Sequence, residues 1–162
     1  MHLLERTTLI KSRREDVFAF FQDAKNLSRI TPPWLGLTIR EIDEPPMRKG
    51  FRIEHTLRWM FVRLTWDVVI KDFEPPRYFA DEQVKGPYKY WRHVHTFEDV
   101  EGGTMMRDRV QYQLPFGALG SITHALVVKR QLRSIFDYRN RQIRMILATA
   151  SARGADSPRS SP

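Results

Sequence analysis

Three ionisable side chains, Asp81, His93 and His95, lie in the short stretch 81–98, DEQVKGPYKYWRHVHTFE. Residues two apart on a β-strand point to the same face, so His93 and His95 share a face, as do Asp81 and Gln83 on the preceding strand. Imidazole titrates near neutral pH, and a neighbouring carboxylate tunes its pKa. The pattern therefore indicates acid–base chemistry, a metal site or a buried polar network.

Large aromatic residues share these faces with the ionisable ones. Trp91 and Phe97 alternate with the two histidines, and Phe79 precedes Asp81. A protein interior keeps polar groups only where they are paired or where water or a ligand reaches them. We therefore interpret the mixed face as the wall of a ligand pocket, with aromatic walls and a few polar groups that orient the ligand. A hydrogen-bonded network in a packed core and a solvent-exposed face are the alternatives.

Other expected elements add residues to this pocket from strands 51–60, 62–74 and 105–114 and from a C-terminal helix. The full ligand-binding prediction is His55, Trp66, Asp81, Gln83, Trp91, His93, His95, Phe97, Asp108, Tyr112 and Phe136.

A catalytic role would fall on the same residues. His93 or His95 could act as a base, with Asp81 or Asp108 as its orienting group. Tyr112 could donate a hydrogen bond to a developing enolate. The candidate catalytic residues are therefore His93, His95 and Asp108. Ser-His-Asp hydrolysis is not supported, because no serine stands in a nucleophile-elbow context.

Metal and cofactor chemistry has little support in the sequence. His93, His95 and Asp81 match the two-histidine, one-carboxylate type of non-haem iron site. However, any strand with a His-x-His pattern places two imidazoles on one face. We predict no metal and no other cofactor. The chain has no cysteine, which excludes disulfides, thiolate metal sites and a cysteine nucleophile.

The rest of the chain predicts the elements that position these residues. Residues 3–10 form a first strand, followed by a helix capped by Ser12 with Glu15 as its capping-box partner. A second short helix runs from about Asp23 to the Pro32-Pro33 pair. Period-two alternation and short turns then predict antiparallel strands through residue 114, and a 3.6-residue period predicts one long helix over 121–149.

This element order predicts an α+β fold. About seven strands form a curved antiparallel sheet that wraps around the long C-terminal helix, with two short helices after strand 1. Residues 1–149 form one domain, and the Ser-, Pro- and Gly-rich residues 150–162 form a disordered polar tail.

Four stretches carry a family resemblance: EDVFAFFQDAKNLSRITPPW, DFEPPRYFADEQVKGPYKYWRHVHTFE, GGTMMRDRVQYQLPFG and LVVKRQLRSIFDYR. Over residues 3–147 the chain resembles the START-like (SRPBCC) superfamily, and within it a bacterial subgroup of polyketide cyclase/dehydrase-like proteins. The resemblance implies the helix-grip fold and a cavity for an apolar or amphipathic molecule. It implies no particular reaction, since the superfamily includes carriers, cyclases and hydrolases.

The chain is strongly basic, with a net charge of +8 and six lysine or arginine residues within 129–144. No zinc-finger spacing, RNA-binding aromatic signature or Gly-rich phosphate loop accompanies this charge, so we expect no nucleic-acid partner. The basic residues are interpreted as a solvated helix face, with peripheral membrane contact as the alternative. No segment approaches the roughly 18 apolar residues of a membrane span. We expect a cytoplasmic protein, and the sequence does not indicate its oligomeric state.

Three functions are consistent with these observations. The first is binding of a small hydrophobic or amphipathic molecule, such as a lipid, a quinone or a polyketide-like compound, between sheet and helix. The second is a cyclase or dehydratase that uses His93 or His95 with Asp81 or Asp108. The third is a membrane- or protein-interaction module that uses the basic C-terminal helix.

Overall fold

A seven-stranded antiparallel sheet forms the framework of the protein, with strand order β1-β7-β6-β5-β4-β3-β2. The computed structural model describes residues 1–59, 62–115 and 127–155. The strands are β1 (His2–Ile10), β2 (Thr38–Ile42), β3 (Arg52–Trp59), β4 (Val62–Glu74), β5 (Tyr78–Lys85), β6 (Tyr90–Val100) and β7 (Gly103–Gln113). The predicted curved antiparallel sheet is thus confirmed, with β1 closing onto β7.

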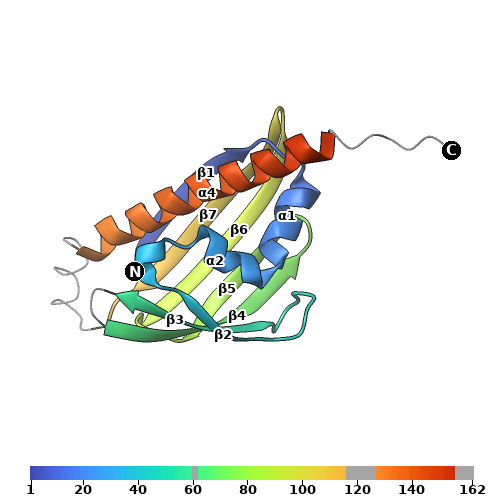
Figure 1. Cartoon of the computed structure of the whole chain (residues 1–162). Coiled ribbons are helices and arrows are strands. Elements are labelled where there is room, and N and C mark those ends of the chain that lie inside the picture. Colours follow the sequence, from blue (N-terminus) through green and yellow to red (C-terminus); the bar gives the residue numbers. More distant parts are fainter. Residues whose placement is uncertain (60–61, 116–126, 156–162) are drawn as a thin grey trace.

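The helices lie on one face of the sheet (Figure 1). They are α1 (Arg14–Gln22), the short η1 (Ala24–Asn26), α2 (Leu27–Ile30), η2 (Pro33–Leu35) and the long α4 (Lys129–Ala155). In Figure 1, α4 crosses the sheet diagonally, and α1 and α2 lie beside it. This is the helix-grip fold that the family resemblance implied, with the sheet and long helix that the element order predicted. None of the described helices is long and apolar enough to cross a membrane.

Two predicted helix boundaries are wrong. The N-cap of α1 is Arg13, whose side chain makes no capping hydrogen bond, so the capping box of Ser12 and Glu15 does not form. Ser12 is instead tied to β7, because the Thr104 hydroxyl donates a 2.7 Å hydrogen bond to the Ser12 carbonyl oxygen.

The second wrong boundary is the end of the last helix, predicted at residue 149. The helix α4 continues to Ala155, so residues 150–155 are helical and do not belong to a disordered tail. Ala148, Ala150 and Ala152 explain this extension, since alanine has the highest helix propensity. Residues 121–126 at the predicted helix start and residues 156–162 of the predicted tail lie outside the described residues.

The face of β6 follows the predicted alternation. Trp91, His93, His95 and Phe97 are all buried, while the residues between them are only partly buried. Register shifts in the β2–β3 and β4–β5 pairs bend the sheet, because each bulge adds local twist. The bent sheet turns the buried face of β6 toward α4.

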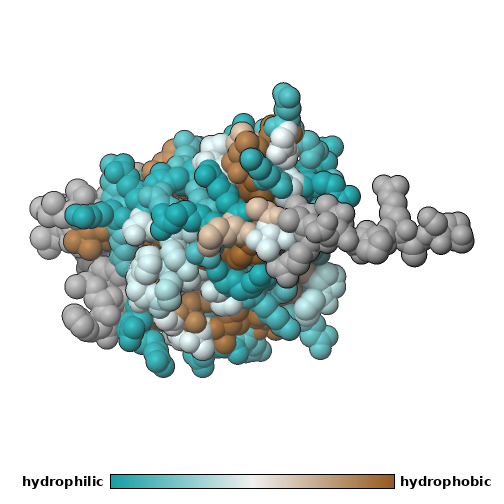
Figure 2. Space-filling model, turned by 45° about the horizontal axis from the view of Figure 1, so that its top comes forward, coloured by the Kyte–Doolittle hydropathy of each residue, from teal (hydrophilic) through white to brown (hydrophobic). Residues whose placement is uncertain are grey.

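Two hydrophobic clusters fill the space between sheet and helices. The first, here the phenylalanine cluster, includes Phe18, Phe21, Phe79, Phe97 and Ile143. The second, here the Trp91 cluster, includes Leu4, Trp91, Tyr112, Leu132 and Phe136. Hydrophilic residues dominate the face shown in Figure 2, and hydrophobic residues form small separate patches on it.

Replacing Ile143 by alanine tests the phenylalanine cluster. Ile143 is fully buried on α4, so Ile143→Ala is expected to lower the free energy of unfolding by about 2–5 kcal/mol. Met145, which is 56% exposed on the same helix, provides the control: Met145→Ala is expected to change stability by less than about 0.5 kcal/mol. Urea denaturation measures both values, and equal losses would contradict this account of the core.

Candidate functional site

Four ionisable residues from three adjacent strands meet beneath α4. They are Asp81 on β5, His93 and His95 on β6, and Asp108 on β7, and we call them the His–Asp cluster. The register places Asp81 opposite His93 and Asp108 opposite His95. Both histidines and Asp108 are only 3% exposed. Strand pairing therefore brings together residues that are up to 27 positions apart in the sequence.

Asp108 holds both imidazole rings through one oxygen atom. His93 Nε2 lies 2.9 Å from Asp108 Oδ1, in hydrogen-bond geometry. His95 Nδ1 lies at the same 2.9 Å from that oxygen, an ion-pair distance. Among the described residues His95 Nδ1 has no hydrogen-bond partner, so its contact with Asp108 is an ion pair. The shared oxygen fixes which nitrogen of each ring faces β7.

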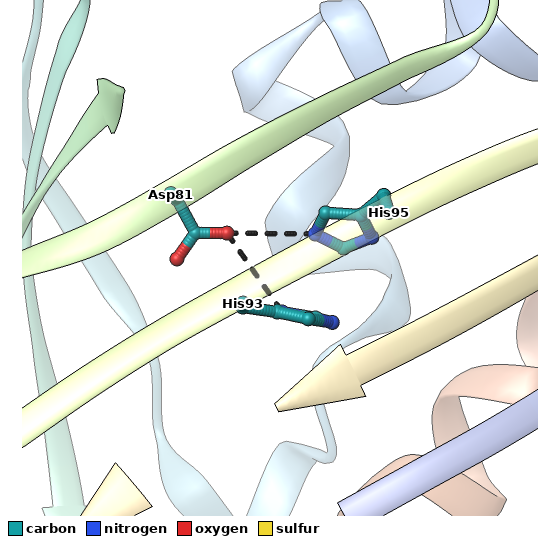
Figure 3. Close-up of side chains that lie close together, drawn as sticks. All are labelled: Asp81, His93 and His95. Atoms are coloured by element: carbon teal, nitrogen blue, oxygen red, sulfur yellow. Dashed lines mark ion pairs between the residues drawn. The ribbon is translucent and has the colours of Figure 1, made fainter. Parts of the chain in front are cut away.

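The other nitrogen of each ring faces Asp81. His93 Nδ1 lies 3.7 Å from Asp81 Oδ2, and His95 Nε2 lies 3.4 Å from it. Both distances exceed the 2.7–3.2 Å range typical of N–H···O hydrogen bonds. Figure 3 shows one Asp81 oxygen directed at both rings from the neighbouring strand. The His–Asp cluster thus has a tight side at Asp108 and a loose side at Asp81.

The two rings lie at the boundary between the hydrophobic clusters. His95 stacks on Phe79 of the phenylalanine cluster, with ring centroids 4.3 Å apart. His93 contacts Phe136 of the Trp91 cluster edge-on, at 5.3 Å. Apolar neighbours on both sides lower the local dielectric, which strengthens every charge interaction in the His–Asp cluster.

The two carboxylates keep their charge despite burial. Burial by itself would raise the pKa of Asp108, but His93 and His95 outweigh this effect and hold the pKa far below its usual range. Burial opposes ionisation of Asp81 in the same way, and its contact with His95 and the charges of His93 and Arg139 lower its pKa. Both residues are therefore anions at neutral pH.

The two imidazoles differ in their affinity for a proton. Burial, followed by repulsion from His95, lowers the pKa of His93. Burial also acts against the charged form of His95, but Asp108 and Asp81 overcome it and raise the pKa of His95. Just above pH 6.5, the usual pKa of an imidazole, the pair therefore holds a cationic His95 beside a neutral His93, the kind of divided pair that supplies one acid and one base.

Arg139 adds a cation to the same space from α4. Its guanidinium lies over the Phe136 ring, 5.5 Å from the centroid. Among the described residues it makes no ion pair and no hydrogen bond. Burial lowers the pKa of Arg139, and attraction to Asp108 and Asp81 partly offsets this effect. The other five basic residues of 129–144 are exposed, as the solvated-face interpretation predicted.

A cavity of about 510 Å³ lies between the sheet and α4. Its lining is mostly apolar and aromatic, with polar groups at the His–Asp cluster. Seven predicted site residues line it: His55, Trp66, Asp81, Trp91, His93, His95 and Phe136. This placement rejects the interpretation of the mixed face as solvent-exposed.

Four other predicted site residues stand outside the lining. Asp108 lies behind the two rings, and Phe97 and Tyr112 are buried in the hydrophobic clusters. Gln83 binds the backbone of the hairpin instead: its Nε2 donates a 2.7 Å hydrogen bond to the Tyr88 carbonyl oxygen, and its Oε1 accepts one from the Tyr88 N–H. These residues shape the cavity without reaching it.

His55 and Trp66 form a second polar element of the wall. Their rings stack with centroids 5.9 Å apart. Burial lowers the pKa of His55, so this imidazole is neutral. Among the described residues, neither His55 Nδ1 nor Trp66 Nε1 has a hydrogen-bond partner. Such unpaired atoms favour a site that accepts polar atoms of a ligand over a closed core.

Sequence reasoning missed Arg139, Tyr88 and the apolar residues that α1 and α2 contribute to the wall, among them Phe21 and Ile30. Tyr88 lies in the loop beside Gly86-Pro87, where no periodicity predicts which way a side chain points. The signal for Arg139 was present, since it interrupts an apolar stripe of the helix.

The family model for polyketide cyclase / dehydrase and lipid transport matches residues 10–135. The chain belongs to this family. No curated protein matches the sequence.

Several solved structures resemble this chain. The chain is 25% identical to a nucleoside-diphosphate sugar epimerase from Corynebacterium glutamicum, with a TM-score of 0.67 over 94% of this chain and 30% of that one. A protein from Nitrosomonas europaea gives a TM-score of 0.69 at 9% identity, covering 93% and 96% of the two chains. Ara h 8.0201 gives 0.60 at 15% identity, covering 88% and 97%. All three structures show that the fold is shared.

Replacing Asp108 by asparagine tests the tight side of the His–Asp cluster. At neutral pH, Asp108→Asn is expected to lower the free energy of unfolding by about 3 kcal/mol, because it leaves buried imidazoles without their anion. The pKa of Asp108 is lowered in the folded state, so its contribution is complete well above pH 3.8 and is lost as the pH falls below that value. The difference in the free energy of unfolding between the wild type and Asp108→Asn is therefore expected to become smaller in acid.

Urea denaturation between pH 7 and pH 3 measures this difference. The control is Asp137→Asn, since Asp137 is a half-exposed residue whose ion pair with Arg6 spans 3.2 Å. Such a pair contributes about 0–1 kcal/mol. A stability difference for Asp108→Asn that is small, or that does not change with pH, would contradict the electrostatic role of Asp108.

Proposed function

We propose that this protein binds a small hydrophobic or amphipathic molecule in the cavity between the sheet and α4. The observation that carries the proposal is the cavity itself, about 510 Å³ in volume with mostly apolar walls. Ligand pockets typically have volumes of about 300–1,000 Å³ and a few polar groups that orient the ligand. Lipids, quinones and polyketide-like compounds have the required size and chemistry.

The polar end of the cavity sets the orientation of such a ligand. The apolar part would lie against Leu64, Val68 and Leu132, which line the cavity. A carbonyl or hydroxyl group would lie near Arg139 and the His–Asp cluster, where both donors and acceptors are available. The membership in a family described by polyketide cyclisation and lipid transport supports this class of ligand.

A substitution that fills the cavity tests the proposal. Ile135 lines the cavity from α4, so Ile135→Trp is expected to weaken binding of the neutral fluorophore N-phenyl-1-naphthylamine at least tenfold. The control is Met145→Trp, which places the same side chain on the exposed side of the same helix. Fluorescence titration measures both dissociation constants. Equal affinities for the two variants, or no saturable binding to the wild type, would reject the cavity as a ligand site.

Acid–base catalysis is a second candidate function, favoured by the divided proton affinity of the two imidazoles. The Nε2–H group of His93 donates a hydrogen bond to Asp108 Oδ1, which leaves Nδ1 able to accept a proton. His95 supplies the cation that would stabilise negative charge on a carbonyl oxygen. Proton abstraction next to a carbonyl is the step that a cyclase or a dehydratase requires.

Replacing His93 by glutamine separates the two functions. Exchange of the α-protons of an apolar aryl ketone in D2O, followed by NMR, reports the abstraction step. If the protein is an enzyme of this kind, His93→Gln is expected to slow protein-catalysed exchange by about 10²–10⁴-fold while fluorophore binding changes little. Exchange no faster than in buffer, or equal exchange with the variant, would leave binding as the function.

A further inference from the structure

We infer that Asp81, His93 and His95 form a binding site for one divalent transition-metal ion, with an open coordination position toward the cavity. The donor atoms are Asp81 Oδ2, His93 Nδ1 and His95 Nε2. One donor atom from each of the three residues lies within 4.8 Å of the others. This inference revises the expectation from the sequence, which named the same three residues but predicted no metal.

The distances on the loose side of the His–Asp cluster suit an ion better than a hydrogen bond. The 3.4 Å and 3.7 Å separations from Asp81 Oδ2 are long for N–H···O contacts. Ligands bound at about 2.0–2.2 Å in a tetrahedron lie roughly 3.3–3.6 Å from one another. One ion between the three residues would therefore satisfy all of them with little movement.

The tight side supplies the support that metal-bound histidines require. A metal-ligating imidazole usually interacts with a carboxylate through its other nitrogen, which fixes the ring and its tautomer. Asp108 Oδ1 lies 2.9 Å from His93 Nε2 and 2.9 Å from His95 Nδ1. One buried carboxylate thus orients two ligands at once, and both rings present their remaining nitrogen to Asp81 (Figure 3).

The charges and donor types define the class of ion. Two imidazoles and one carboxylate suit Zn²⁺, Fe²⁺ or Co²⁺ and disfavour Mg²⁺, which prefers oxygen ligands and retains its waters. Metal binding would release the proton of His95, since a ligating imidazole is neutral. The two carboxylates and Arg139 then sum to −1, so a dication brings the site to +1. A hydroxide or an anionic ligand group in the open position would neutralise that charge.

Metal titration of the full chain tests the site. The protein is first stripped of metal with a chelator, then loaded with Zn²⁺ and dialysed. Inductively coupled plasma mass spectrometry is expected to find one zinc ion per chain. Co²⁺ is expected to give visible absorption bands that Zn²⁺ abolishes and Mg²⁺ does not. Asp81→Asn is the central variant, because Asp81 makes no short hydrogen bond that folding requires, and it is expected to raise the dissociation constant more than about 100-fold.

Two further variants separate this site from adventitious binding. Asp108 is not a proposed metal ligand, but it orients the two histidine rings. Asp108→Asn is therefore expected to weaken metal binding about 10–100-fold. His2→Gln removes a histidine outside the cluster, next to the chain's amino terminus, and is expected to leave the dissociation constant unchanged. The inference is overturned if the wild type retains no ion, if Asp81→Asn binds as tightly as the wild type, or if His2→Gln abolishes binding.

Discussion

The contact of one buried carboxylate with two imidazoles governs the interior of this protein. Asp108 can remain charged beneath α4 only because His93 and His95 approach the same oxygen atom, each at 2.9 Å. In return, Asp108 fixes the orientation of both rings and raises the proton affinity of one of them. A fully buried anion without such partners would cost several kcal/mol, so the three residues fold as a unit.

The unit of Asp108, His93 and His95 explains how one end of the cavity can be polar although the interior around it is apolar. The phenylalanine cluster and the Trp91 cluster pack against the outer sides of the two rings, and the cavity opens where sheet and helix separate. Asp81 and Arg139 face that space from opposite layers, one from the sheet and one from the helix. A family whose members share this fold can therefore vary its chemistry by changing a few polar residues on a constant framework.

The sequence predicted what depends on period and composition. Strand alternation has a period of two, so the shared face of Trp91, His93, His95 and Phe97 could be predicted directly, and so could the antiparallel sheet with its long helix. Register and helix rotation depend on tertiary packing. The sequence pattern therefore could not predict that Asp108 contacts both rings or that Arg139 points inward. Gln83 shares the predicted face but serves the hairpin, because the loop folds back within its reach.

The most direct test of this account is nitrogen NMR of the histidine side chains of the metal-free protein as a function of pH. The account predicts that just above pH 6.5, the usual pKa of an imidazole, His93 is neutral with its proton on Nε2 while His95 is doubly protonated. Two rings that titrate together near pH 6.5, or a His93 protonated on Nδ1, would contradict the central role of Asp108.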